Sequence, residues 1–194
     1  MRSRKRLDAA SKAAHRGAVT QTAPHLSLRA ATQSKHEQVD ATFARYDLAD
    51  PASYADLLTA HARVLPPIER VLTGFAALPS FFPRSAALAQ DMAALGRTMP
   101  APNDVSPPAS AAAAWGMLYV IEGSRLGGVF LARAVPPDLP KAYLSAGHAR
   151  GGWRALLDAF DAAADAGGFA WQKEARAAAV ATFDLYAAAV RLEA

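Results

Sequence analysis

The first candidate for chemistry is one histidine, His36, on the apolar side of a predicted helix. It shares this stripe with four residues at helical spacing: Leu28, Thr32, Val39 and Phe43. A lone histidine on an apolar face is more often a satisfied core residue than a metal ligand. If it does bind a metal, one imidazole is too few ligands for a zinc or diiron site, but it can serve as one axial ligand of haem iron.

The second candidate is a group of glycines within residues 109–134, a segment that otherwise predicts one long helix. Glycine inside a helix costs about 1 kcal/mol relative to alanine, and this chain uses alanine freely. The positions of Gly116, Gly123 and Gly127 place them on one face at about 3.6 residues per turn, with Gly128 beside them. Such a bare face permits a close helix crossing, or the approach of the backbone to a planar cofactor with a bend at the paired glycines.

The elements that must position these residues are all predicted to be helices. Apolar residues recur at helical spacing, and strand-like alternation is absent. Asp50 followed by Pro51 is a typical helix start, whereas Pro66 and Pro67 predict a kink or break. Gly167 and Gly168 predict an interruption near the end of the chain. The expected helices span residues 27–46 (N-cap Ser27), 51–65, 68–75, 84–97, 109–134, 153–164 and 171–192, with 51–65 and 68–75 counted as one kinked helix.

Composition and charge divide the chain into two parts. With 194 residues and 52% hydrophobic content, it has room for one well-buried domain, here expected at residues 25–194 as a compact all-α bundle. The net charge is +4, yet residues 1–24 hold six basic residues against one acidic residue. The remainder, with 15 basic and 16 acidic residues, is close to neutral. We therefore expect a disordered, solvated basic arm and no nucleic-acid partner.

The sequence also argues against secretion and membrane insertion. Lys12, His15 and Arg16 interrupt the apolar run that a secretory signal would need, and no segment approaches about 20 apolar residues. The absence of cysteine excludes disulfides, thiolate metal sites and a cysteine nucleophile. We expect a cytoplasmic protein.

Two separated motifs resemble those of bacterial haem oxygenases. Residues 28–40, LRAATQSKHEQVD, are similar to the family's proximal-helix motif, and residues 119–128, YVIEGSRLGG, are similar to its distal-helix motif. The resemblance runs from about residue 27 to the C-terminus. Between the motifs, six positions are similar to the family's second helix: Tyr54, Leu57, Leu58, His61, Pro67 and Glu69.

The resemblance implies a fold in which haem lies between a proximal helix and a kinked distal helix. It implies oxidative opening of haem at a meso carbon to biliverdin, carbon monoxide and iron, with dioxygen and with electrons from an external reductase or ferredoxin. Haem is then both substrate and cofactor. The type is the one associated with bacteriophytochromes or with iron acquisition.

The resemblance also implies roles for particular residues. His36 would be the proximal axial ligand of the haem iron. Gly123, Gly127 and Gly128 would let the distal helix approach the haem face, and the first two would shape the dioxygen pocket and so steer dioxygen toward a meso carbon.

The polar residues of the site match the family less well. Animal-type members carry an aspartate just after the first distal glycine, where this chain has Ser124, so Ser124 and Arg125 are the candidates for the proton relay. The haem propionates need cations. Arg29, seven residues before His36, matches a basic position of the family, and Arg133 and Arg154 are weaker matches.

Other functions on helical folds remain to be weighed. No glutamate is followed three residues later by histidine, which excludes the usual diiron oxidase ligands. Thiaminase-like enzymes would need a cysteine. The alternative from another class is a haem-binding or haem-carrying protein that does not open the ring, and a helical interaction protein without haem is a third possibility.

Overall fold

A computed structural model of the protein describes residues 22–191, in which six α-helices occur and no strand. The helices are α2 (Pro24–Phe43), α3 (Pro51–Leu72), α4 (Ser85–Ala94), α5 (Ala111–Leu131), α6 (Ala142–Ser145) and α7 (Gly152–Arg191). The all-helical prediction is confirmed. The basic arm expected at residues 1–24 lies outside the described residues except for its last three positions.

The ends of the helices follow local chemistry. Asp50 caps α3 as predicted, because its carboxylate accepts the N–H of Ser53 at 2.7 Å. The hydroxyl of Ser110 caps α5 by accepting the N–H of Ala113 at 3.1 Å. The prediction of Ser27 as the first N-cap is wrong, because α2 begins earlier, at Pro24. Proline suits the first position of a helix because it has no N–H group that would lack a partner there.

Of the kink or break predicted at Pro66 and Pro67, the break does not occur, because α3 continues through both prolines. A proline at position 67 cannot donate to the carbonyl of Arg63, four residues earlier. The N–H of Asn103, in the segment between α4 and α5, donates to that carbonyl instead at 2.8 Å. The tertiary structure thus replaces a hydrogen bond that the helix lacks.

The predicted interruption near Gly168 is present as a kink inside α7. Gly168 has φ 70° and ψ −164°, a conformation that glycine adopts without a Cβ penalty, and helix continues on both sides of it. The four-residue helix α6 was not predicted, since so short an element has no periodicity to detect.

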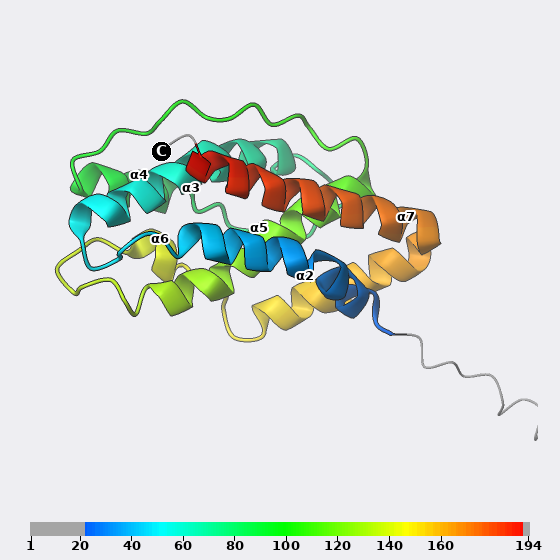
Figure 1. Cartoon of the computed structure of the whole chain (residues 1–194). Helices are drawn as coiled ribbons and strands as arrows, with labels where there is room; N and C mark the ends of the chain where they lie inside the picture. Colours follow the sequence, from blue (N-terminus) through cyan, green and yellow to red (C-terminus); the bar gives the residue numbers. More distant parts are fainter. Residues whose placement is uncertain (1–21, 192–194) are drawn as a thin grey trace, which may run out of the picture.

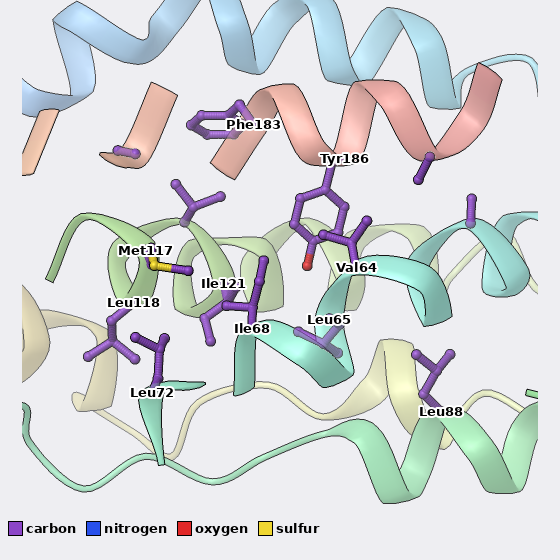
Figure 2. Close-up of a cluster of buried hydrophobic side chains, with 14 of the residues drawn as sticks. Val64, Leu65, Ile68, Leu72, Leu88, Met117, Leu118, Ile121, Phe183 and Tyr186 are labelled. Atoms are coloured by element: carbon purple, nitrogen blue, oxygen red, sulfur yellow. The ribbon is translucent and has the colours of Figure 1, made fainter. Parts of the chain in front are cut away.

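Figure 1 shows α2 lying alongside the second half of α7, with α5 crossing behind them. The core forms where α3, α5 and α7 meet, and Figure 2 shows Tyr186 of α7 directed toward Val64 of α3. Within residues 22–191, no helix is both long and apolar enough to cross a membrane.

Candidate functional site

A cavity of about 870 Å³ lies between α2, α5 and α7, with α3 and α6 at its side. This volume is within the range of about 300–1,000 Å³ that small-molecule sites occupy. Residues from both sequence motifs line the cavity: His36 and Arg29 come from α2, and Gly123, Gly127 and Ser124 come from α5. The fold therefore brings the two motifs to one space.

His36 is a cavity residue rather than a core residue. Its side chain is 61% exposed, and its Nδ1 lies 2.9 Å from Oδ2 of Asp40, one turn further along α2. Its ring meets the ring of Phe183 edge to face at 5.7 Å between centroids. An Nδ1–H donated to Asp40 leaves Nε2 as the lone-pair nitrogen, the arrangement in which a second group orients a metal-binding imidazole.

The glycines of α5 fall into two groups. A Cβ on Gly116 would overlap the carbonyl oxygen of Ala175 in α7, and a Cβ on Gly128 would lie 3.0 Å from the carbonyl oxygen of Leu144. These two glycines permit close backbone packing, although Gly128 also lines the cavity. A Cβ on Gly127 would meet nothing within 4 Å, and one on Gly123 would meet only the Trp153 ring, at 3.5 Å.

Ser124 is held by a residue that the sequence did not single out. Nη2 of the buried Arg84 donates to Oγ of Ser124 and to the carbonyl oxygen of Ile121, each at 2.7 Å. The hydroxyl of Ser124 in turn donates to the same Ile121 carbonyl at 2.7 Å. The hydroxyl hydrogen is therefore already engaged, and Ser124 offers the cavity an acceptor rather than a donor.

A histidine and a tyrosine extend this polar surface. Nδ1 of His61 lies 2.5 Å from the hydroxyl of Tyr143, whose ring lies beneath the Arg84 guanidinium at 5.1 Å. Burial, assisted by the charge of Arg84, lowers the pKa of His61 to about 3, so this imidazole is neutral at physiological pH. We call Arg84, Ser124, Tyr143 and His61 the polar wall of the cavity.

Tyr186 adds a buried hydroxyl next to the polar wall. It lines the cavity and is 4% exposed, and among the described residues its hydroxyl has no hydrogen-bond partner. Burial raises its pKa well above the usual value, so the group is a neutral donor. An unpaired buried hydroxyl costs about 1–3 kcal/mol.

Three predicted site arginines do not line this cavity. Nε of Arg125 lies 2.9 Å from both carboxylate oxygens of Glu122, and its Nη atoms donate to the carbonyls of Ala146 and Phe82. Arg154 is exposed and pairs with its neighbour on α7, Asp158. Arg125 and Arg154 share a separate, more open depression of about 470 Å³.

Arg133 is exposed near the end of α5, with its guanidinium 5.9 Å from the centroid of the Phe130 ring. Arg29 is the predicted propionate ligand that the structure does place at the cavity. Its charge partly offsets the rise in the pKa of Tyr119 that burial causes, which indicates that the two side chains are neighbours.

Sequence reasoning missed Arg84 and Tyr143, and left His61 without a role. His61 lay within the similarity to the second helix, so its position was available as a clue. Arg84 and Tyr143 stand at the starts of α4 and α6, where no periodic pattern marks an inward side chain.

Part of the chain is similar to a known protein. No family model matches the chain. A curated protein of Xanthomonas campestris pv. campestris (strain 8004), named "Heme oxygenase", is 40% identical over 97 residues, which are 47% of this chain and 58% of that protein. The chain thus spans little more than half the length of this relative. The similarity supports a relationship to the haem oxygenase family over about half of the chain.

Proposed function

We propose that the protein is a haem oxygenase that opens haem at a meso carbon to biliverdin, carbon monoxide and iron, using dioxygen and an external reductant. The observation that carries the proposal is that His36 from α2 and the glycines Gly123 and Gly127 from α5 line the same cavity. Two segments distant in the sequence thus supply a possible metal ligand and a close-fitting wall. The similarity to a curated haem oxygenase supports the same conclusion.

The residues of the cavity fit a haem group. Nε2 of His36 is the available ligand nitrogen, with Asp40 orienting the ring through Nδ1. Because Gly127 carries no side chain into the space beside α5, a flat ring can approach that backbone. The exposed Arg29 guanidinium can pair with a propionate at the cavity edge.

When bound, haem would supply the iron at which electrons from the external reductant reach dioxygen, and its ring would be the substrate. The protein's part would be to orient the bound ring and to place hydrogen-bond donors and acceptors beside it. Ser124 acts as an acceptor held by Arg84, so it positions a hydrogen-bond partner and does not itself donate. The donors that remain are the Tyr186 hydroxyl and Nε of Arg84, neither of which has a partner within residues 22–191.

A hemin turnover assay tests the proposal. The protein mixed with hemin should give a Soret band, and ascorbate or a reductase with oxygen should convert the complex to biliverdin, identified by chromatography. His36→Ala should abolish or strongly alter the axial ligation and stop turnover. His148→Gln, at a histidine outside the cavity, is the matched control and should leave the spectrum unchanged. An unaltered spectrum in His36→Ala would refute the proximal assignment.

One observation favours a second candidate, a haem carrier that leaves the ring intact. The position after the first distal glycine is Ser124, and its hydroxyl hydrogen is committed to a backbone carbonyl. If the polar wall delivers no proton, the protein binds hemin and gives a stable spectrum under reductant and oxygen. The same assay thus separates the two functions.

A further inference from the structure

Three of the described helices, α2, α4 and α6, begin without a capping side chain of their own, and the starts of α4 and α6 lie next to the polar wall. α4 follows Arg84 and α6 follows Lys141, and neither of these N-cap residues makes a side-chain cap hydrogen bond. The first N–H groups of a helix have no partner within the helix, so they need acceptors from elsewhere. In this protein a buried carboxylate from another helix supplies the acceptors in both cases.

At the start of α4, the acceptor is Glu69 of α3. Its carboxylate accepts the N–H of Arg84 at 2.7 Å and the N–H of Ser85 at 3.0 Å, and it also accepts the Ser85 hydroxyl. Glu69 is only 3% exposed, so these three donors replace the water that its carboxylate would otherwise contact. The start of α4 is therefore tied to one point on α3.

At the start of α6, the acceptor is Asp91 of α4. One carboxylate oxygen accepts the N–H of Tyr143 at 2.8 Å, and the other accepts the N–H of Ala142 at 3.1 Å. Asp91 is 2% exposed. Glu69 thus connects α3 to the start of α4, and Asp91 connects α4 to the start of α6.

At each of these helix starts, one residue whose N–H group is held in this way projects onto the cavity. Arg84, held by Glu69, sends its guanidinium to Ser124 and over the ring of Tyr143. Tyr143, held by Asp91, places its hydroxyl at Nδ1 of His61. Each carboxylate therefore fixes the backbone of a residue of the polar wall.

We propose that Glu69 and Asp91 are positioning residues that set the geometry of the polar wall. The role of that wall beside a bound ligand rests on the proposed function, whereas the positioning itself is a property of the protein alone. Neither carboxylate is among the residues that line the cavity. Their substitution acts on the wall through Arg84 and Tyr143.

Histidine labelled with ¹⁵N, followed by NMR in the protein without hemin, tests the Asp91 branch. Tyr143→Phe removes the partner of His61 and should shift the ring-nitrogen resonances of that histidine. Asp91→Leu should shift the same resonances in the same direction, and the double variant should match Tyr143→Phe because both changes act on the same contact between Tyr143 and His61. Asp91→Asn, which keeps one acceptor oxygen and is the milder change, should give an intermediate shift.

The guanidinium resonances of Arg84, assigned by their loss in Arg84→Lys, test the Glu69 branch. Restricted Nη resonances are expected because Nη2 donates two hydrogen bonds. Glu69→Gln should shift or broaden these resonances. Leu88→Ala is the control for both branches, since it removes a buried α4 side chain without touching either cap and should lower only the melting temperature.

The proposal is overturned if the His61 resonances of the folded variants Asp91→Asn and Asp91→Leu are the same as in the unchanged protein. It is likewise overturned if Glu69→Gln leaves the Arg84 resonances unchanged. Glu69 and Asp91 would then be helix caps that contribute to stability alone. Failure of the protein to bind hemin would refute the proposed function but would not alter either NMR result. In the hemin complex, Asp91→Asn should lower the turnover rate by more than it lowers hemin affinity.

Discussion

Gly116 and Gly127 share a face of α5, but only Gly116 touches another backbone. The carbonyl of Ala175 occupies the place of a Gly116 Cβ, whereas a Gly127 Cβ would enter open space. A bare glycine face is consistent with a close helix crossing and with the approach of a cofactor. Gly116 fits the helix crossing, whereas Gly127 leaves the open space that a cofactor would need. Substitution of these two glycines should therefore change the free energy of unfolding by different amounts.

Gly127→Ala should therefore raise the free energy of unfolding by about 1 kcal/mol, because alanine is the better helix former and meets no neighbour. Gly116→Ala should lower it by roughly 1–3 kcal/mol, because α5 and α7 must move apart. Urea unfolding of both variants measures the two changes. Equal losses of stability would contradict the open space beside Gly127.

A larger side chain at the same position addresses the cavity. Gly127→Leu should suppress hemin turnover by more than it weakens hemin binding, since the leucine would fill the space next to α5. Spectral titration with hemin gives the affinity, and biliverdin formation gives the turnover. Undiminished turnover in this variant would refute the close approach of a ligand to the glycine face.

His61 makes stability depend on pH. Its pKa is lowered from 6.5 to about 3 in the folded protein, mainly by burial. The unfolded chain thus binds a proton below pH 6.5 that the folded protein does not bind, and the free energy of unfolding falls as pH falls. The expected loss from this group is about 2 kcal/mol between pH 6.5 and pH 5. Denaturant unfolding of His61→Gln and of the unchanged protein at pH 6.5 and pH 5 measures this loss. The variant should lose less unfolding free energy between the two pH values than the unchanged protein does. An equal loss in both proteins would refute the role of His61.

At the scale of elements, α2 is the least embedded of the long helices. Only Leu28 and Thr32 are buried along it, and it packs mainly against α7. Polar contacts hold it there: His25 at its start pairs with Asp161 at 2.5 Å, and Lys35 near its middle pairs with Asp184 at 2.7 Å. Its inner face is otherwise the wall of the cavity.

The amides of α2 should consequently exchange hydrogen faster than those of α3, whose inward residues are buried along most of its length. Hemin should slow exchange in α2 more than in α3, because the ligand would supply the missing packing surface. Hydrogen exchange measured by mass spectrometry, with and without hemin, tests this. Protection of α2 equal to that of α3 in the free protein would contradict it.

At the scale of the whole molecule, every described residue that lines the cavity lies between His25 and Tyr186. The strongly basic residues 1–21 lie outside the described part of the chain, and the rest of the chain is near neutral. Within residues 22–191, the cavity lining comes from the helices and from Arg84, the residue before α4.

A chain that begins at residue 22 should therefore keep its helical circular dichroism spectrum and bind hemin with unchanged affinity. Hemin titration of the two forms under the same conditions makes the comparison, and several salt concentrations should give the same result. A large loss of affinity on removal of residues 1–21 would show that the basic segment takes part in binding.

The sequence was sufficient for the helical class, for most helix positions and for the pairing of His36 with the glycine segment. Periodicity and capping are local properties, so Asp50, Pro51 and Gly168 could be interpreted without the fold. The two motifs could be matched because each lies within one helix. His36 nevertheless proved to be exposed at a cavity, although its stripe also suggested a core residue.

The tertiary structure alone decided what surrounds those motifs. Arg84 and Tyr143 reach the cavity because carboxylates on other helices hold their backbones, and Pro67 stays helical because Asn103 supplies the missing donor. Arg125, beside Ser124 in the sequence, points to another depression. Such contacts join residues far apart in the chain, and their energies depend on distances that no local pattern of residues encodes. The helices and their motifs were thus readable from the sequence, whereas the polar wall required the assembled fold.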